Sequence, residues 1–295
     1  MTLSQLEIFT RVAELKSFTL AAMSLNISQS AVSHAIKSLE KDFNVSLFTR
    51  EQNQVTLTEI GNTLLNRAQH ILSLQETMRQ EALATNGLKK GVLRIGSFGP
   101  GSSTGILPPL LKAFRQQYPS IEIIVDEGDD ESVAQWLLEK RIDIGVVVLP
   151  DERFDTFLVK HDQYVAILPL GHPLTHYDGV TLKQLCEYPF NLTQAGSGKI
   201  VMGLFSAQKL TPKIQFRTRQ LLSTFSLVAR NEAVSIVAQL AIPENINNII
   251  VKPLIPRVTR DIAFAVNNYS DASPATKAFI KLIKNRYCDL SICSC

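Results

Sequence analysis

The sequence has no hydrophobic run long enough to cross a bilayer. Its longest strongly apolar stretch, Ile142 to Leu149, is the length of a β-strand and contains Asp143, whereas a membrane-spanning helix needs about 20 apolar residues. The first twenty residues carry Glu7, Arg11 and Glu14 at helical spacing, which excludes the apolar core of a secretion signal. We therefore expect a cytoplasmic protein with no membrane partner.

Cysteine and net charge are also scarce. Three of the four cysteines, Cys288, Cys293 and Cys295, lie close together with no His nearby. Their spacing matches no common zinc motif, and disulfides rarely persist in a reducing compartment, so we expect no metal and no cofactor. Residues 1–90 carry nine Lys or Arg and eight Asp or Glu. Any nucleic-acid binding must therefore use a few well-placed basic groups rather than bulk charge.

Two short helices joined by a tight turn are predicted before residue 45. Ser17 can cap a helix that Asn26 ends, and Ser28 can cap a second helix that runs to about Phe43. The second helix has an apolar side and a polar side. In helix-turn-helix proteins the N-terminal end of the second helix enters the major groove of DNA. The residues of this helix that we predict to contact DNA are Ser28, Gln29, Ser30, Ser33, His34 and Lys37; a merely solvated face is the alternative.

Two β-prone segments follow and predict a small hairpin or wing. They are residues 46–50 and 54–57, separated by the polar turn Glu51-Gln52-Asn53. A wing beside a reading helix can contact the DNA backbone or the minor groove. The wing residues predicted to do so are Arg50, Asn53, Gln54, Thr56 and Thr58.

A long helix is predicted from Thr58 to about residue 85. About 28 residues at 1.5 Å each give a length of about 40 Å. Its apolar residues recur every three or four positions, close to the seam of a coiled coil, so the helix alone would expose that seam. We predict pairing with a second copy of the chain through Ile60, Leu64, Ala68, Ile71 and Met78. Asn86-Gly87 and Gly91 then indicate a hinge.

Strands and helices alternate from residue 91 onward. A βαβαβ pattern over residues 92–149 predicts a parallel sheet. A second set of elements follows between residues 164 and 238, and the tail adds a strand at 261–266 and a helix at 274–286. Two lobes with a cleft between them are therefore expected. Lobe I comprises about 91–160 and 266–295, and lobe II about 161–265.

Residues 3–61 resemble the N-terminal domain of LysR-type transcriptional regulators, and a weaker resemblance extends along the chain. The matching segments are Leu6-Glu7-Ile8-Phe9, Ser17-Phe18-Thr19-Leu20-Ala21-Ala22, Ser28 to Ile36, Leu39-Glu40, Leu47-Phe48-Thr49-Arg50 and Leu57-Thr58-Glu59-Ile60-Gly61. The resemblance implies a helix-turn-helix at about 18–37, dimerisation through the long helix, and assembly mostly as tetramers. It also implies an effector-sensing C-terminal domain. Double-stranded DNA with an inverted-repeat operator is the expected partner, and RNA polymerase is a candidate one.

Two Gly- and Ser-rich loops, at residues 97–105 and 193–199, each precede a predicted helix. Ligands of such folds bind at the carboxyl ends of parallel strands, and helix N-termini favour anions. We therefore predict a small polar or anionic effector between the lobes, although each loop taken alone can be only a turn and a cap. The predicted effector residues are Ser97, Gly101, Ser102, Ser103, Thr104, Glu127, Pro150, Thr193, Gly196, Ser197, Lys199 and Thr218.

The chain departs from the family pattern at one place. Relatives commonly have a Gly-x-Gly turn followed by Leu-Pro in the region matching residues 228–238. This chain has neither the glycines nor the proline there, and Arg230 and Glu232 add charge instead. We therefore expect a different pocket wall in this region.

Two other functions stay open on the residues alone. An enzyme built on the two lobes lacks a defensible Ser–His–Asp set, a metal cluster or a dinucleotide fingerprint. A solute-binding protein of the periplasmic type would have the same two lobes but no helix-turn-helix.

The favoured prediction is a sequence-specific transcription regulator that is controlled by an effector and is not an enzyme. Its fold is α/β overall, with lobes like those of periplasmic binding proteins. The predicted domains are a mainly helical winged helix-turn-helix domain at 1–58, a dimerisation linker helix and hinge at 59–90, and a two-lobed effector-binding domain at 91–295.

Overall fold

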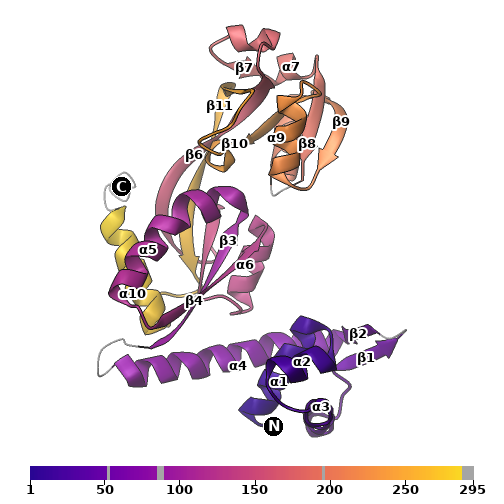
Figure 1. The fold of residues 1–295 in the computed structure, drawn as a ribbon, viewed down its shortest axis with the longest axis vertical. Coiled ribbons are helices and arrows are strands. Elements are labelled where there is room, and N and C mark those ends of the chain that lie inside the picture. Colours follow the sequence, from indigo (N-terminus) through magenta and orange to yellow (C-terminus); the bar gives the residue numbers. More distant parts are fainter. Residues whose placement is uncertain (52–53, 85–89, 195–196, 288–295) are drawn as a thin grey trace.

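The computed structural model describes residues 1–51, 54–84, 90–194 and 197–287. A small helical domain stands at one end of a long helix, and a two-lobed α/β domain lies above that helix (Figure 1). Lobe I is next to the long helix, and lobe II is at the far end of the molecule (Figure 1). No helix among the described residues is long and apolar enough to span a bilayer.

The N-terminal domain has the predicted helices and hairpin. Its elements are α1 (Leu3–Leu15), α2 (Phe18–Ser24), α3 (Gln29–Phe43), β1 (Phe48–Glu51) and β2 (Gln54–Leu57). The predicted caps are confirmed: the Ser17 hydroxyl accepts from the Leu20 amide at 3.2 Å, and the Ser28 hydroxyl from the Ala31 amide at 3.1 Å. Asn26 has a φ of 54°, the left-handed conformation that lets the chain turn between α2 and α3.

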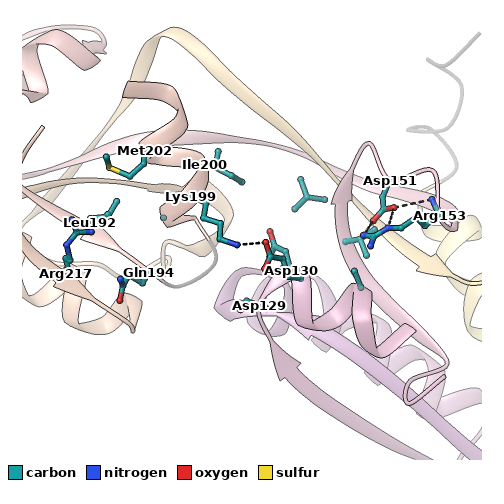
Figure 2. A pocket seen from close by; sticks show the side chains of 15 residues that line it. Asp129, Asp130, Asp151, Arg153, Leu192, Gln194, Lys199, Ile200, Met202 and Arg217 are labelled. Carbon is teal, nitrogen blue, oxygen red and sulfur yellow. Dashed lines mark hydrogen bonds and ion pairs between the residues drawn. The ribbon is translucent and has the colours of Figure 1, made fainter. Parts of the chain in front are cut away.

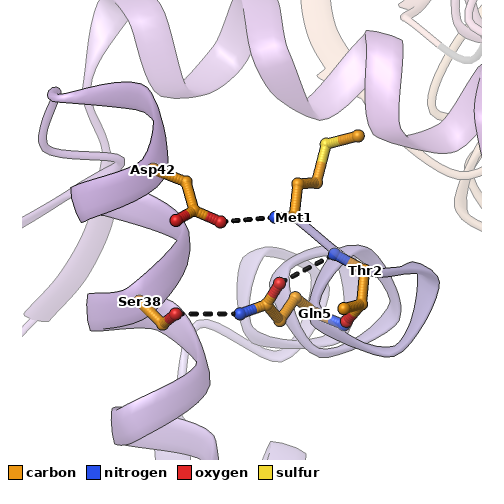
Figure 3. A network of polar contacts seen from close by, with 5 residues as sticks. All are labelled: Met1, Thr2, Gln5, Ser38 and Asp42. Atoms are coloured by element: carbon orange, nitrogen blue, oxygen red, sulfur yellow. Dashed lines mark hydrogen bonds and ion pairs between the residues drawn. The ribbon is translucent and has the colours of Figure 1, made fainter.

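Aromatic packing and a polar network hold these helices together. The rings of Phe9 and Phe18 both meet Phe48 edge-on, at centroid distances of 5.6 and 5.8 Å. At the surface, Gln5 of α1 donates to the Ser38 hydroxyl of α3 at 3.0 Å, and the N-terminal amine pairs with Asp42 (Figure 3). These two contacts hold the start of α1 against the C-terminal half of α3.

Helix α4 (Glu59–Ala84) begins as predicted, because the Thr58 hydroxyl accepts from the Gly61 amide at 2.9 Å. The predicted seam is only partly exposed, however. Ala68 is 2% exposed and packs with Leu64 in the core of its own domain, so the helix turns this side toward α1. The large apolar residues of α4 that stay exposed are Ile60, Ile71, Leu74, Met78 and Leu83.

The end of α4 is anchored to lobe I by a buried amide. Gln80 is 1% exposed. Its amide nitrogen donates to the Val92 carbonyl at 2.9 Å, and its oxygen accepts from the Ala275 amide at 3.3 Å. Nearer the middle of α4, a ring nitrogen of His70 contacts the Leu138 carbonyl oxygen at 3.0 Å. The long helix therefore carries lobe I along its side.

The C-terminal domain is built on one sheet with the strand order β4-β3-β5-β11-β6-β10-β8-β9, and β7 pairs with β11. The strands are β3 (Gly91–Phe98), β4 (Ile121–Gly128), β5 (Ile144–Leu149), β6 (Asp155–Pro169), β7 (Val180–Thr181), β8 (Pro189–Thr193), β9 (Lys213–Thr218), β10 (Val234–Ala238) and β11 (Ile249–Val266). The helices and short helical turns are η1 (Gly101–Ile106), α5 (Leu107–Gln117), α6 (Asp130–Leu138), η2 (Pro173–His176), α7 (Leu182–Leu185), α8 (Gly198–Ala207), α9 (Leu221–Ala229), η3 (Gln239–Ala241) and α10 (Pro274–Arg286). Strand β3 pairs in parallel with β4 and β5, as the βαβαβ pattern predicted.

Strands β6 and β11 join the two lobes and are much longer than predicted. The sequence indicated strands only at 164–169 and 261–266, whereas the two strands pair antiparallel from Ile249 to Val266, with an interruption between Pro253 and Val258. Exposed polar residues such as Lys160 and Arg257 interrupt the apolar pattern in the added halves. That interruption hides the strands from a reading of hydrophobicity alone.

Each lobe has its own core, and the boundary between them needs correcting. Ile262, Phe264 and Val266 are buried with Phe114 and Phe279 in lobe I. The sequence-based assignment of residues up to 265 to lobe II is therefore wrong for the last four, 262–265. The core of lobe II is formed around Phe190, Phe205 and Ile236. In the turn before β10, Asn231 has a φ of 61°, the left-handed conformation that lets the chain bend there.

Candidate DNA-contacting surface and interlobe cleft

The outer face of α3 is a polar surface with few charges. Ser28, Gln29, Ser30, His34 and Lys37 are exposed. The Ser28 and Ser30 hydroxyls lie 2.9 Å apart. This arrangement presents hydroxyl, amide and imidazole groups along one edge of the helix, with the ammonium of Lys37 near the middle of α3.

Ser33 belongs to the same edge but is half-buried. Its hydroxyl accepts from the Gln29 amide at 3.0 Å. Gln29 and Ser33 lie one turn apart, so this bond orders the two side chains on the face that points away from the domain core.

The wing residues differ in what they can offer. Thr56 is exposed, and its hydroxyl lies 2.6 Å from that of Thr49 across the hairpin. The Thr58 hydroxyl donates to the Ser46 carbonyl at 2.8 Å and also caps α4, so its donor is already used within the domain. Asn53 lies outside the described residues, and nothing is described of the Arg50 and Gln54 side chains.

Between the lobes lie two adjoining cavities of about 660 and 570 Å³. They share Asp129, Asp130 and Gln194. Volumes of this order hold small organic ligands. In Figure 2, Lys199 of lobe II points across the gap toward α6 of lobe I. Its ammonium lies 2.7 Å from the Glu131 carboxylate, so an exposed ion pair joins the two lobes at the cleft.

The loop after β3 lines the cleft differently from the prediction. Phe98, Gly99, Pro100 and Gly101 line the smaller cavity. Gly101 approaches the backbone of Leu240 so closely that a Cβ would lie 3.0 Å from it. Of the residues predicted in this loop, only Gly101 therefore borders the cavity.

The hydroxyls predicted in this loop bond within the loop instead. The Ser97 hydroxyl lies 2.6 Å from that of Ser102 and 2.8 Å from that of Ser103. Thr104 donates to the Pro100 carbonyl at 2.6 Å. The π-helical turn η1 widens the start of α5, so these side chains satisfy one another and the local backbone rather than facing the cavity.

Of the predicted residues in lobe II and at the strand ends, some border the cavities and others do not. Ser197 and Lys199 border the cavities, whereas Glu127 and Pro150 do not. Thr193 is buried, and Thr218 bonds to the Thr224 hydroxyl at 2.7 Å and to the Asn191 amide at 3.1 Å. Both threonines therefore belong to the interior of lobe II. Gly196 lies outside the described residues.

Charged residues line the cleft and were missed from the sequence. Lobe I contributes Asp129, Asp130 and Glu131 at the start of α6, and lobe II contributes Arg217 and Arg219 around the end of β9. Charged residues are common near strand ends, so no feature of the sequence distinguishes these five from the others. The only indication was their position, because they lie at or after the carboxyl ends of strands β4 and β9, where ligands of such folds bind.

Arg260 of β11 forms part of the wall of the smaller cavity and is paired with a buried carboxylate. Its guanidinium Nε donates to Asp162 at 2.8 Å, and the two side chains are only 8% and 3% exposed. The guanidinium also stacks near the rings of Phe98 and Tyr164, at 5.5 and 5.3 Å. The charge of Arg260 is therefore already compensated within the protein.

Asp130 and Asp129 differ in their electrostatics although they are neighbours. Burial raises the pKa of Asp130 above its ordinary value, even though the nearby Arg260 acts to lower it. Hydrogen bonds from Ser132 lower the pKa of Asp129, whose side chain caps α6 by accepting the Ser132 amide at 2.7 Å. Asp129 is thus a structural cap. No described residue forms an ion pair with the Asp130 carboxylate, and only its own backbone amide is within hydrogen-bonding reach of it.

Comparison with known proteins decides the family. Residues 3–62 match the helix-turn-helix model of bacterial regulatory proteins of the lysR family, and residues 86–287 match the LysR substrate binding domain. The chain belongs to the LysR family. It is a DNA-binding transcription regulator with an effector-binding domain, in a family of regulators rather than enzymes.

Curated relatives support the same assignment over nearly the full length. The chain is 31% identical over 293 residues to the uncharacterized HTH-type transcriptional regulator YvbU of Bacillus subtilis, covering 97% of this chain and 99% of YvbU. It is 35% identical over 244 residues to the probable HTH-type transcriptional regulator LrrA of Synechococcus elongatus, covering 82% of each chain.

Solved structures share the whole architecture. A full-length OxyR variant from Pseudomonas aeruginosa matches with a TM-score of 0.74 at 21% identity, covering 97% of this chain and 94% of OxyR. The LysR family regulator CbnR, complexed with its target DNA, matches with a TM-score of 0.67 at 21% identity, over 97% and 99% of the two chains. These matches confirm the predicted order of helix-turn-helix, long helix and α/β domain.

Proposed function

We propose that this LysR family regulator acts in the cytoplasm and binds an inverted-repeat operator as a homodimer or homotetramer. A small polar effector held between lobes I and II changes that binding. The observation that carries the proposal is the interlobe cleft, two adjoining cavities with shared walls from both lobes. A ligand that contacts both lobes binds their relative arrangements unequally, and unequal binding is the requirement for control.

The exposed polar edge of α3 supports the DNA-reading part of the proposal. Gln29 can make paired hydrogen bonds with adenine, and the hydroxyls of Ser28 and Ser30 can bond to several bases. His34 and Lys37 stand where phosphate or guanine would be in reach. The net charge of residues 1–90 is small, so specific contacts and a second copy must supply the affinity.

The exposed apolar residues of α4 support self-association. Leu74 and Met78 are 62% and 63% exposed, and Ile60 and Ile71 are 41% and 38% exposed. Residues 71, 74 and 78 follow one another at spacings of three and four, which places them on one stripe of the helix. A second α4 covering this stripe would bury it and set two α3 helices on one duplex.

The test is an anisotropy titration of the full chain against labelled DNA from upstream of its own gene. We expect binding well above that of a scrambled duplex, with an affinity that falls steeply as salt rises. Equal affinity for the scrambled duplex at every salt concentration would contradict sequence-specific binding.

The effector part is tested with the variant Leu222→Trp, which enlarges an exposed side chain on the wall of the smaller cavity. Leu170→Trp makes the same change at an exposed leucine outside the cavity walls and is the matched control. We expect Leu222→Trp to keep operator binding and to lose the response to a metabolite extract. An unchanged response in that variant would contradict a site in this cavity.

A further inference from the structure

The cleft carries charges of opposite sign on its two lobes, and most of them are already paired. Asp151 receives two hydrogen bonds from Arg153, at 2.8 and 2.7 Å. Glu131 is paired with Lys199, Arg260 with Asp162, and Asp129 caps α6. Each of these groups has its partner within the protein.

Three charged groups of the cleft have neither an ion pair nor a helix-capping role among the described residues. One is the Asp130 carboxylate on lobe I, which borders both cavities. The other two are the Arg217 and Arg219 guanidinium groups on lobe II. Arg219 borders the smaller cavity and Arg217 the larger one. A ligand that satisfies this set needs a cationic group for lobe I and an anionic group for lobe II.

A cationic partner would stabilise the Asp130 carboxylate more than it would stabilise a fully exposed one. It lies near the buried pair of Arg260 and Asp162, and two carboxylates with one guanidinium leave one negative charge at this wall. Burial penalises that charge, which is why the pKa of Asp130 is raised. A ligand ammonium placed here would restore a favourable partner for the carboxylate.

The remaining wall of the smaller cavity indicates which group connects the cationic and anionic ends of the ligand. Its apolar wall consists of Phe98, Leu221, Leu222, Ala238 and Ala241. Ser197, Gln194 and Gln220 add hydrogen-bonding groups on the side of lobe II, near Arg219. The wall therefore suits a short aliphatic or aromatic group that carries an ammonium and a carboxylate.

We propose that the effector is a zwitterion of the amino-acid class, held in the smaller cavity with its ammonium on Asp130 and its carboxylate on Arg219. The proposal rests on the effector site proposed above and names its ligand class. Because Asp130 belongs to lobe I and Arg219 to lobe II, a ligand with both charges pairs with one charged group on each lobe. A simple carboxylate would pair with lobe II alone.

The first experiment is calorimetric titration of the full chain with the twenty common amino acids. Each amino acid that binds is then compared with its two analogues that carry a single charge. For leucine these are 4-methylpentanoate and 3-methylbutylamine, and for phenylalanine 3-phenylpropanoate and 2-phenylethylamine. We expect at least one amino acid to bind, with both of its analogues at least about tenfold weaker, since each analogue lacks one of the two charge-assisted hydrogen bonds.

Two substitutions assign the charges to their residues. Asp130→Asn is expected to weaken the amino acid at least about tenfold while leaving the matching carboxylate unchanged or tighter. Arg219→Gln is expected to weaken the amino acid and the carboxylate alike and to leave the amine unchanged. Asp126→Asn and Arg115→Gln, which make the same changes outside the cleft walls, should bind as the unaltered chain does.

The outcomes separate the ligand class from the effector site. A carboxylate that binds as tightly as its amino acid, with loss in Arg219→Gln, would overturn the zwitterion and leave an anionic effector in the same cleft. Binding of no amino acid and none of the analogues would overturn the zwitterion. If Leu222→Trp also left the response to a metabolite extract unchanged, the effector site itself would be overturned.

Discussion

The two surfaces proposed to bind ligands differ in how they are charged. The predicted DNA-contacting residues of α3 carry hydroxyl, amide and imidazole groups and the ammonium of Lys37, and their side chains bond mainly to each other and to their own helix. The interlobe cleft instead contains carboxylates and guanidinium groups from opposite lobes. The first surface suits a long ligand read by hydrogen bonds in two copies. The second suits a small ligand recognised by its charges.

The largest expected effect comes from removing the second copy of the α3 surface. Leu74→Glu with Met78→Glu places two charges on the exposed stripe of α4. We expect a monomer in sedimentation velocity and operator affinity lowered by about 10²–10⁴-fold, because the two half-sites no longer bind together. Leu170→Glu makes the same change at an equally exposed leucine of lobe II, away from α4, and should stay dimeric. A double variant that sediments as the unaltered chain does would refute this interface.

The next effect comes from the reading face itself. Replacing Ser33, His34 and Lys37 together by Ala should weaken operator binding about 100-fold, since each good base contact contributes about 1–3 kcal/mol. Binding in the cleft should not change, because these residues lie in the N-terminal domain. Anisotropy with operator and scrambled DNA checks the loss of specificity. Full affinity with full specificity in the triple variant would remove these residues from the interface.

A smaller effect is expected where the two regions are joined. Gln80→Leu leaves the Val92 carbonyl and the Ala275 amide without their partner. Each loss costs about 1–3 kcal/mol when the group stays buried, so we expect the melting temperature to fall by at least about 2–4 °C. The response of DNA binding to effector should weaken as well. Gln75→Leu, on the exposed side of the same helix, is the control and should change neither quantity.

The smallest expected effect concerns the thermal stability of the protein when no ligand fills the cleft. The raised pKa of Asp130 means that its charged form destabilises the folded protein at pH values above the ordinary carboxyl pKa. Asp130→Asn should therefore raise the melting temperature at pH 7 by about 2–4 °C, the change expected for about 1 kcal/mol. The gain should shrink as the pH approaches 4, where the carboxyl is protonated. A gain that is the same at pH 7 and pH 4 would exclude the charge as its cause.

The features that were predicted from the sequence are those that depend on a few neighbouring residues. Ser17, Ser28 and Thr58 cap the helices that they were expected to cap, because a cap depends on a few neighbouring residues. The tail helix 274–286 also has the predicted bounds. Helix periodicity alone did not show that Ala68 faces α1, since a stripe of apolar residues can be buried in its own domain or against a second copy.

The cleft was less predictable, because residues far apart in the sequence meet there. Asp130, Arg219 and Arg260 come from three different elements, and nothing local distinguishes them from other surface charges. The loop serines were predicted to face the ligand, but Ser97, Ser102 and Ser103 bond to one another. Local composition indicated a loop that borders the smaller cavity, and only the fold shows that its backbone and Phe98, rather than its hydroxyls, line that cavity.

The central claim is that a ligand bridging the lobes controls DNA binding, and one measurement tests it most directly. Operator affinity is measured by anisotropy with and without a saturating concentration of the tightest-binding amino acid, for the unaltered chain and for Asp130→Asn. The account predicts a change of about 5–150-fold in the unaltered chain, the usual range of allosteric coupling, and little change in the variant at the same concentration. Equal operator affinity with and without the amino acid in the unaltered chain would contradict it.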